Sequence, residues 1–470
     1  MRRTSATKHS RQSRDALAAD AERVARVRAF AKKHLGGMKR PSGGDYAVHG
    51  REIAKVMKEV TDDPTLLNVA MLHDLPLHPD GERLLREAPL NREERELVRK
   101  MHALRHLQLD RDMEALNNAL HAFIDEPRLL PLRITHRLVD IRMLRDIPGK
   151  LRTDLARETL SMYCAFAERL GMNRWRHEME DGCFAYLYPK ETAEIRRLLK
   201  QSEAQDRRDL SRAKAAIQRE LKARGINAEI VVSRKCVYTT YTAMQRERKA
   251  FGELHDRLKL LVLTEDVQSC YGVLGVAHSL FHPMPGALKD YVSVPKDNGY
   301  QSVDTAVYPL AGVTRQPLRV NIRTRAMHEA CEFGIERGGR MLHTCNSWLD
   351  MLRYLNQRKG DIRTPKQFAA VLRSYFGDGI TIYDGNASMY RLQPPVSALD
   401  FACHVYGDSA ARLHKIFRNC MPCPRETLLS DGDIVDVTFA SETKLRPDWL
   451  KACRHRSSVA LLGKLLAEMK

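Results

Sequence analysis

A short stretch in the middle of the chain carries the residues best suited to bind a nucleotide. Lys289 and Lys296 stand seven residues apart, Asn298 and Gly299 form a turn signal, and Tyr300 follows at once. Lysine binds phosphate as a point charge, a tyrosine ring can stack on a base, and glycine allows the positive φ of a tight bend. These residues predict a nucleotide site in a loop between a helix and a sheet. On composition alone, a solvated basic loop is an equally good interpretation.

A second group of residues that could do chemistry lies in the N-terminal half, where His49 is followed by the pair His73-Asp74. Imidazole and carboxylate groups bind divalent metal ions, and a bound ion lowers the pKa of a coordinated water, which creates a nucleophile. This spaced H…HD pattern is that of an HD-type phosphohydrolase. Without their flanking residues, one histidine and one His-Asp pair on helices are more often structural.

The composition is that of an ordinary globular protein of two to four domains, with 43% hydrophobic and 29% charged residues in 470. The net charge of +19 favours a polyanionic partner, such as nucleotides, RNA or a ribosome surface. No apolar run approaches the roughly 20 residues that cross a bilayer, so no membrane partner is expected. The ten cysteines have no regular spacing, which indicates a reducing compartment and a cytoplasmic location.

Hydrophobic periodicity predicts the elements that must position these residues. Apolar residues recur at helical spacing from Asp15 to about Glu194, and a long charged helix over Ser202–Arg224 ends at Gly225. The clearest helices of this half are expected at Glu52–Val60, Pro64–Leu72 and Asp154–Leu170, the last stopped by Gly171.

From Ile226 the periodicity changes to that of a mixed α/β domain with a central sheet. Strands are expected at Ile226–Val232, Leu258–Leu263, Ser302–Tyr308 and Leu318–Ile322, with helices at Val267–Leu280 and Arg325–Arg337. A small β-rich module follows, with a hairpin from Ile380, a helix near Ala398–Cys403 and a strand at Ile434–Phe439.

The N-terminus is rich in Arg, Lys and Ser and has no acidic residue before Asp15. This composition predicts a disordered basic arm, although an organelle-targeting peptide has a similar composition. The expected divisions are an arm at 1–20, a helical domain at 21–195, an α/β domain at 196–340, a helical linker at 341–376, a β-rich module at 377–442 and a tail at 443–470.

Two motifs closely resemble the synthetase domain of the RelA/SpoT family, which makes and degrades the alarmone (p)ppGpp. They are KDYxxxPKxNGYQS at 289–302 and IRTxxMHExxExG at 322–334. The helical half is similar to the hydrolase domain of the same family at 40–49, 71–74, 159–163, 168–172 and 178–181. The last module resembles a TGS domain at Pro394, 398–402, Asn419, 432–433 and 448–450.

The resemblance implies a multidomain α+β fold with three parts. These are an N-terminal all-α HD-type domain, a central mixed α/β nucleotidyltransferase-like synthetase domain, and a small C-terminal β-grasp-like TGS domain. It also implies guanine nucleotides and ATP as ligands, and tRNA or the ribosome as partners through the TGS-like domain and the basic surface.

In the synthetase half the resemblance assigns Arg234 and Lys235 to ATP, and Asp256 to catalysis and Mg²⁺. It assigns Lys289, Lys296, Asn298 and Tyr300 to the acceptor nucleotide. Four positions depart from the family: Ala243 replaces a lysine, Leu261 an arginine, Asp304 a histidine and Arg319 the second catalytic carboxylate. An arginine in place of a carboxylate reverses the charge, and Mg²⁺ would be repelled rather than held.

In the helical half the resemblance assigns His49, His73, Asp74 and His136 to a divalent metal, Mn²⁺ or Zn²⁺, with His136 standing where the family has an aspartate. The family's Glu-Asp pair, which orients the attacking water, is replaced by Leu77 and His78. A leucine offers neither a base nor a hydrogen-bond acceptor, so hydrolysis by the family mechanism is expected to be lost.

The sequence therefore predicts a protein of (p)ppGpp metabolism and the stringent response that has degenerate catalytic sites and retains guanine-nucleotide binding. Two alternatives stay open. One is an active, diverged synthetase that transfers pyrophosphate from ATP to GDP or GTP and uses Mg²⁺. The other is a residual metal-dependent (p)ppGpp phosphohydrolase.

Overall fold

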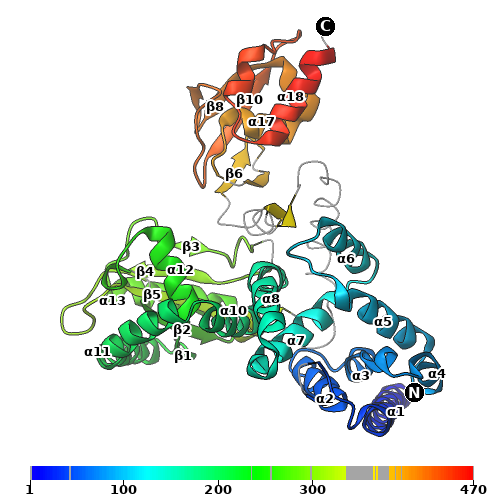
Figure 1. The fold of residues 1–470 in the computed structure, drawn as a ribbon. Helices are drawn as coiled ribbons and strands as arrows, with labels where there is room; N and C mark the ends of the chain where they lie inside the picture. Colours follow the sequence, from blue (N-terminus) through cyan, green and yellow to red (C-terminus); the bar gives the residue numbers. More distant parts are fainter. Residues whose placement is uncertain are drawn as a thin grey trace. The chain divides into compact units, whose positions relative to one another are not determined.

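The computed structural model describes residues 3–41, 44–233, 236–254, 257–296, 299–334, 364–365, 367–368, 380–386, 388–392 and 394–468. The chain divides into two compact units, Met1–Ala369 and Ala370–Lys470 (Figure 1). Most of the predicted linker at 341–376 lies outside the described residues. Within the described part of the chain, no helix has the length and apolar character needed to cross a membrane.

The first part of unit 1 is helical, as predicted. The starts of its helices follow local capping rules: the side chain of Asp63 accepts a hydrogen bond from Thr65 N, with Pro64 in the first turn, and Asn91 forms a capping box with Glu94. The helices are α1 (Arg3–Leu35), α2 (Tyr46–Met57), α3 (Pro64–Leu72), α4 (Gly81–Glu87), α5 (Arg92–Ala103), α6 (Met113–Asp125), α7 (Leu129–Arg142), α8 (Gly149–Glu158), α9 (Cys164–Arg169) and α10 (Asn173–Leu187).

The structure shows continuous helices at two places where the predicted divisions of this part fall. The structure has one helix, α1, from Arg3 to Leu35 where a disordered arm was expected at 1–20. Arginine, lysine and alanine are strong helix formers, so the composition that suggests a basic arm also suits a helix. The expected boundary between residues 195 and 196 falls inside the continuous helix α11 (Pro189–Ala223), which begins with Pro189 in its first turn.

The second part of unit 1 is an α/β domain built on a five-stranded mixed sheet of order β1-β2-β5-β4-β3. Strands β2 and β5 are parallel, and the other neighbouring pairs are antiparallel. Helix α13 has the predicted bounds. The elements are β1 (Ala228–Val232), α12 (Val237–Glu247), β2 (Leu258–Thr264), α13 (Val267–Leu280), β3 (Lys289–Asp290), β4 (Val303–Val307), β5 (Leu318–Thr324) and α14 (Arg325–Phe333).

Alternation along β2 and β5 separates an apolar face from a polar face. Helices α11 and α13 pack against the apolar face (Figure 1), which contains Leu258, Leu260, Val262, Leu318, Val320 and Ile322. The intervening residues point to the opposite face, because successive side chains of a strand alternate. The parallel register pairs Lys259 with Arg319, Leu261 with Asn321 and Leu263 with Arg323.

Polar contacts join the helical part to the α/β domain within unit 1. The carboxylate of Asp181 on α10 accepts hydrogen bonds from the backbone N–H groups of Val237 (3.3 Å) and Tyr238 (2.9 Å), and so caps the first turn of α12. The side-chain amide of Asn173 donates to the carbonyl oxygen of Cys331 on α14 at 2.7 Å.

Gly334 lies at this junction between the helical part and the α/β domain. It ends α14 at φ +68°, and a Cβ there would overlap the carbonyl oxygen of Leu170. Gly225, at the end of α11, has the same φ of +68° and no atom near a Cβ. Both alanine variants carry the backbone strain of a positive φ, but only Gly334→Ala adds a backbone clash. We expect Gly334→Ala to lower the free energy of unfolding by more than about 2 kcal/mol.

Urea unfolding of the two alanine variants and the wild type tests this expectation. The matched variant Gly225→Ala should cost about 1 kcal/mol. Equal losses in the two variants would mean that Leu170 is not packed against Gly334.

Unit 2 is a mixed sheet of order β7-β6-β10-β8-β9, in which β6 and β10 are parallel neighbours. Its core includes fully buried Phe401 and Val435. The predicted hairpin, helix and final strand are confirmed. The elements are β6 (Ile380–Asp384), β7 (Met389–Leu392), α17 (Ala398–Tyr406), β8 (Leu413–Arg418), β9 (Met421–Cys423), β10 (Ile434–Phe439) and α18 (Arg456–Glu468).

Candidate nucleotide and metal sites

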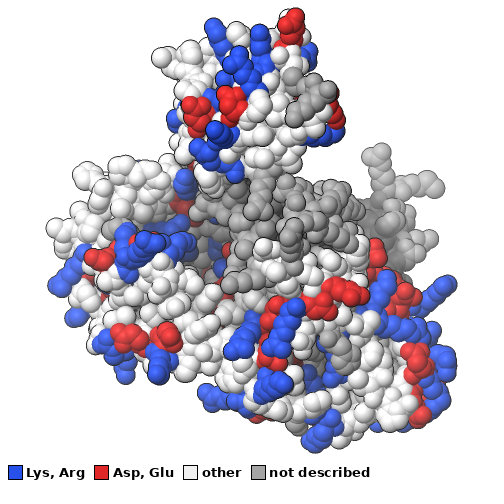
Figure 2. Space-filling model, turned by 45° about the horizontal axis from the view of Figure 1, so that its top comes forward, with Lys and Arg blue, Asp and Glu red and all other residues white. Residues whose placement is uncertain are grey.

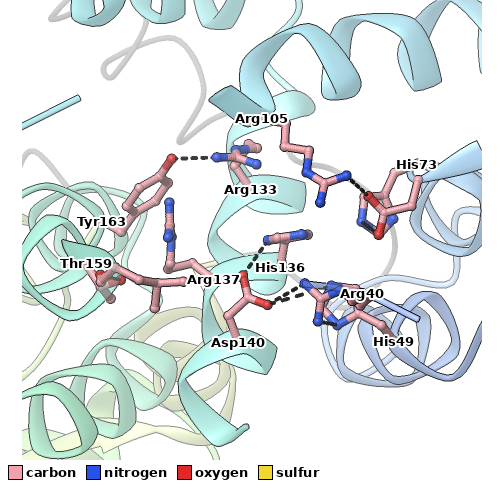
Figure 3. A network of polar contacts seen from close by, with 12 residues as sticks. Arg40, His49, His73, Arg105, Arg133, His136, Arg137, Asp140, Thr159 and Tyr163 are labelled. Carbon is pink, nitrogen blue, oxygen red and sulfur yellow. Dashed lines mark hydrogen bonds and ion pairs between the residues drawn. The ribbon is translucent and has the colours of Figure 1, made fainter. Parts of the chain in front are cut away.

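Three histidines from three helices meet in the helical part of unit 1. His49 lies on α2, His73 caps the end of α3 and His136 lies on α7. All three are buried, and a nitrogen atom of each lies within 4.8 Å of those of the other two (Figure 3). The structure thus brings together three of the four predicted metal ligands at a spacing that one ion could bridge.

The fourth predicted ligand, Asp74, lies beside His73, with its Oδ2 atom 3.2 Å from Nε2 of the imidazole. The His73 ring is oriented by its Nδ1–H, which donates to the carbonyl oxygen of Ala70 at 2.8 Å and leaves Nε2 for another partner. Nε2 of His49 is buried and makes no hydrogen bond, and Nε2 of His73 and Oδ2 of Asp74 are buried with their contact to each other. Orphaned buried polar atoms are costly, so this donor set fits a divalent metal ion.

Asp140 is a member of this site that the sequence did not reveal. It is 3% exposed, its Oδ1 accepts a hydrogen bond from Arg40 Nη2 at 2.9 Å, and its Oδ2 lies 3.1 Å from His136 Nδ1 (Figure 3). Burial alone would raise its pKa, but His136, His49 and Arg40 hold the pKa of Asp140 well below its usual range. The signal that could have found it is the spacing of four residues from His136, which places both on one face of α7.

A cavity of about 340 Å³ opens beside His136 and Asp140. Glu158 pairs with Arg137 at 2.7 Å, and Arg133 donates to the hydroxyl of Tyr163 at 3.0 Å. Four of the five arginines in this wall are ion-paired in the structure, so an anionic ligand would share them with carboxylates of the chain. The charged residues of the wall are Arg40, Arg105, Arg111, Arg133, Arg137, Asp110, Asp140, Asp154 and Glu158.

Leu77 and His78, which replace the family's Glu-Asp pair, are not among the residues that line this cavity. Leu77 ends a short 3-10 helix, and Nδ1 of His78 accepts a hydrogen bond from the backbone N–H of Asp80 at 3.0 Å. These two side chains therefore supply no carboxylate that could activate a water.

Strand β3 and the loop after it hold the predicted nucleotide-binding residues that the structure describes. Lys289 lies on β3, and the Nζ atom of Lys296 lies 4.6 Å from the ring centroid of Tyr291 and 5.6 Å from that of Tyr300. The Tyr300 hydroxyl lies 3.2 Å from both carboxylate oxygens of Asp304. Arg234, Lys235, Asp256 and Asn298 lie outside the described residues.

Next to this loop, a cleft of about 360 Å³ lies on the polar face of β2 and β5. Asn321 belongs to the cleft and donates through Nδ2 to the Tyr300 hydroxyl at 3.0 Å. Arg323 also lines it, 6.0 Å from the Tyr300 ring centroid. The cleft and the loop are therefore continuous. Its described lining is His177, Ser233, Cys236, Thr239, Arg257, Lys259, Leu261, Arg319, Asn321, Arg323 and Glu332.

The described residues of this cleft do not fit Mg²⁺. They include four cationic side chains and a single carboxylate, Glu332, which is itself 3.3 Å from Arg323. Arg319, in the place of the family's catalytic glutamate, lies 3.7 Å from Asp304. Magnesium prefers carboxylate and phosphate oxygens, and the neighbouring cations would repel it.

Comparisons with known proteins agree with this division of unit 1. A family model described as an HD domain matches residues 27–173, and one described as a region found in RelA / SpoT proteins matches residues 233–340. Lys289, Lys296 and Tyr300 lie in the second match, and the three histidines in the first.

Curated relatives match almost the whole chain. A probable guanosine-3′,5′-bis(diphosphate) 3′-pyrophosphohydrolase of Synechocystis sp. is 27% identical over 92% of this chain and 59% of its own length. A GTP pyrophosphokinase of Streptomyces coelicolor is 28% identical over 93% of this chain and 55% of its own. A pyrophosphohydrolase of Aquifex aeolicus is 27% identical over 93% of this chain and 64% of its own. This chain thus spans little more than half the length of these relatives. The chain is thus similar to RelA/SpoT-type proteins over most of its length, and residues 233–340 match the region found in RelA / SpoT proteins.

Proposed function

We propose that this protein acts in (p)ppGpp metabolism and the stringent response as a guanine-nucleotide-binding member of its family that has lost pyrophosphate transfer. Arg319 carries the proposal. Its side chain lines the cleft beside the nucleotide loop, where the family has a carboxylate for metal binding and base catalysis. The loop itself keeps Lys289, Lys296 and Tyr300. Among its described residues, the site therefore keeps groups that hold a nucleotide and has an arginine where the family has a reacting carboxylate.

The tyrosine hydroxyl network supports the binding half of the proposal. Asp304 and Asn321 hold the Tyr300 hydroxyl from the sheet side, and the ring is half-buried rather than enclosed. We infer that the ring stacks on the guanine base while Lys289 and Lys296 hold phosphates. Titration of the protein with GDP, GTP and ppGpp, beside an assay of transfer from labelled ATP, tests both halves.

A second candidate function rests on the histidine cluster. We propose that His49, His73, Asp74 and His136 hold one divalent ion next to the arginine-lined cavity. A bound ion would polarise a phosphoryl group and lower the pKa of a coordinated water. The arginines that line the cavity would bind and orient the polyanionic ligand. Without a carboxylate at 77 or 78, metal-dependent binding of (p)ppGpp is favoured over its hydrolysis.

We further propose that unit 2 is a TGS-like domain. The support is its mixed sheet with the parallel pair β6 and β10 beside α17, which is the β-grasp arrangement expected for such a domain. On the face drawn in Figure 2, Lys and Arg side chains lie among Asp and Glu side chains. A tRNA or ribosome partner for this domain stays a prediction.

The metal site leads to a prediction on the protein as purified. We expect a divalent transition ion to copurify, with Zn²⁺ favoured over Mn²⁺ because most of the donors are imidazoles. His73→Ala removes a direct ligand and should weaken metal binding by more than the roughly ten- to hundredfold that the loss of an outer-shell partner costs. His414→Ala, which changes an exposed histidine of β8, should have no effect.

Elemental analysis after dialysis against a metal buffer measures this. Equal metal content in the wild type, His73→Ala and His414→Ala would contradict a specific site. A wild type that stays free of metal at micromolar free Zn²⁺ would contradict it as well.

A further inference from the structure

We propose that the cleft bounded by Lys259, Arg319 and Arg323 binds the polyphosphate group of a nucleotide without a divalent metal ion. This inference rests on the proposed function and deepens it, because it adds a second set of cations for the phosphates of a nucleotide held by Tyr300, Lys289 and Lys296. The family uses Mg²⁺ for this purpose, and the chain replaces that ion with its own cations.

The positions of these cations follow from strand alternation and register. Lys259 on β2 and Arg319 on β5 are direct neighbours in the parallel ladder, and Arg323 stands four residues further along β5 on the same face. The three side chains therefore lie on one face of the sheet, and all three line the cleft on that face. A fourth cation, Arg257, lies two residues before Lys259 and also lines the cleft.

These cations are only partly neutralised by the residues that the structure describes. Arg257 pairs with Asp206 at 2.9 Å and Arg323 with Glu332 at 3.3 Å. The Nε atom of Arg323 is buried and makes no hydrogen bond. Arg323 and the neighbouring cations of the cleft repel one another, and an anion bound between them would offset this repulsion.

The described residues neutralise Lys259 and Arg319 even less than they neutralise Arg257 and Arg323. Arg319 lies 3.7 Å from Asp304, beyond hydrogen-bonding distance. No side-chain hydrogen bond or ion pair joins Lys259 to another described residue. Burial lowers the pKa of Lys259, and Arg319 and Arg323 lower it further while Asp304 opposes them. An anionic ligand would stabilise the charged lysine, so binding and lysine protonation should favour each other.

The size and position of the cleft fit a chain of phosphates. Its volume of about 360 Å³ is at the small end of the roughly 300–1,000 Å³ typical of ligand pockets. It adjoins the Tyr300 ring through Asn321 and Arg323. A nucleotide whose base stacks on Tyr300 would therefore have the cleft within reach of its phosphates. Guanidinium groups bind phosphate oxygens in pairs, and lysine adds a point charge.

Calorimetric titration of the full-length protein with inorganic tripolyphosphate tests the proposal, in EDTA and then in excess Mg²⁺ at matched ionic strength. Mg²⁺ bound to the ligand cancels charge that the cations would otherwise meet. We expect binding to be at least about tenfold weaker in Mg²⁺ than in EDTA. A site that holds its ligand through the metal ion would bind tripolyphosphate more tightly in Mg²⁺ than in EDTA.

Two variants assign the binding to this cleft. Arg319→Glu, at a side chain that is 42% exposed, should weaken binding in EDTA about ten- to a hundredfold. Lys259→Ala should weaken it about tenfold. Arg219→Glu makes the same charge reversal at an exposed position of α11 and should leave the affinity unchanged. Circular dichroism and thermal unfolding of each variant separate weakened binding from loss of the fold.

The outcomes distinguish this proposal from the proposed function. Tight metal-free binding of tripolyphosphate without binding of GDP would support the cleft and overturn the base-binding loop. Binding of GDP without binding of tripolyphosphate would do the reverse. Equal affinity in the wild type and Arg319→Glu, or binding that requires Mg²⁺, would overturn the metal-free cleft.

Discussion

Incubation of the purified protein with labelled ATP, GTP and Mg²⁺ is expected to give no (p)ppGpp above background. Pyrophosphate transfer depends on charge neutralisation by metal ions and on a group that accepts the proton of the attacking hydroxyl. The described cleft offers Arg319 and Lys259 instead, with one carboxylate, Glu332, already paired with Arg323. Removing a metal ligand and a base together lowers rates by at least about 10⁴-fold.

The reverse substitution Arg319→Glu should restore little activity. It supplies one carboxylate but leaves Lys259 and Arg323 as cations in the cleft and Leu261 as an apolar residue in its wall. Ala243 stays buried against Phe251 and Leu254. Thin-layer separation of labelled products measures both proteins. Robust transfer by the wild type would overturn the loss of synthesis, and strong rescue by Arg319→Glu alone would mean that one residue caused it.

The second large effect is expected from Tyr300→Ala, which should weaken GDP binding about five- to two-hundredfold. A base stacked on an aromatic ring is worth roughly 1–3 kcal/mol, and alanine removes the ring. Tyr300→Phe is the matched control. It keeps the ring and removes only the hydroxyl that contacts Asp304 and Asn321, so it should retain most of the affinity.

Competition of GDP against a fluorescent guanine nucleotide measures the three proteins under identical conditions. If alanine and phenylalanine weaken binding equally, the hydroxyl network matters rather than stacking. If Tyr300→Ala binds GDP as well as the wild type does, the loop is structural.

The fold was predictable where local signals and tertiary packing agree. Helix α13 occupies Val267–Leu280 and strand β10 occupies Ile434–Phe439, as expected, because each is bounded by turn signals and contributes to a core. The predicted boundary at 195–196 falls within α11, which carries one periodic pattern through both parts of unit 1. Its buried residues Leu210, Ile217 and Leu221 belong to the core of the sheet, and sequence alone does not show that one helix serves both parts.

Site residues could be predicted from the sequence only where they belong to short motifs of recognisable chemistry. His49, His73 and His136 are far apart in the chain and meet in the structure. Asp140 and Lys259 were missed for different reasons. Asp140 closes the run 135–140, which was read only for the metal ligand at His136, and only the fold places it beside Arg40. Lys259 is a single charge within an apolar strand, and only the pairing of β2 with β5 places it beside Arg319.

The central claim is that this protein holds a guanine nucleotide without turning it over. One measurement tests this claim most directly. It is a calorimetric titration of the wild-type protein with GDP, followed by addition of ATP and Mg²⁺ to the same cell. The account predicts saturable binding with a dissociation constant well below about 1 mM and no further heat from reaction after ATP is added. Absence of saturable GDP binding, or sustained heat together with formation of ppGpp, would contradict it.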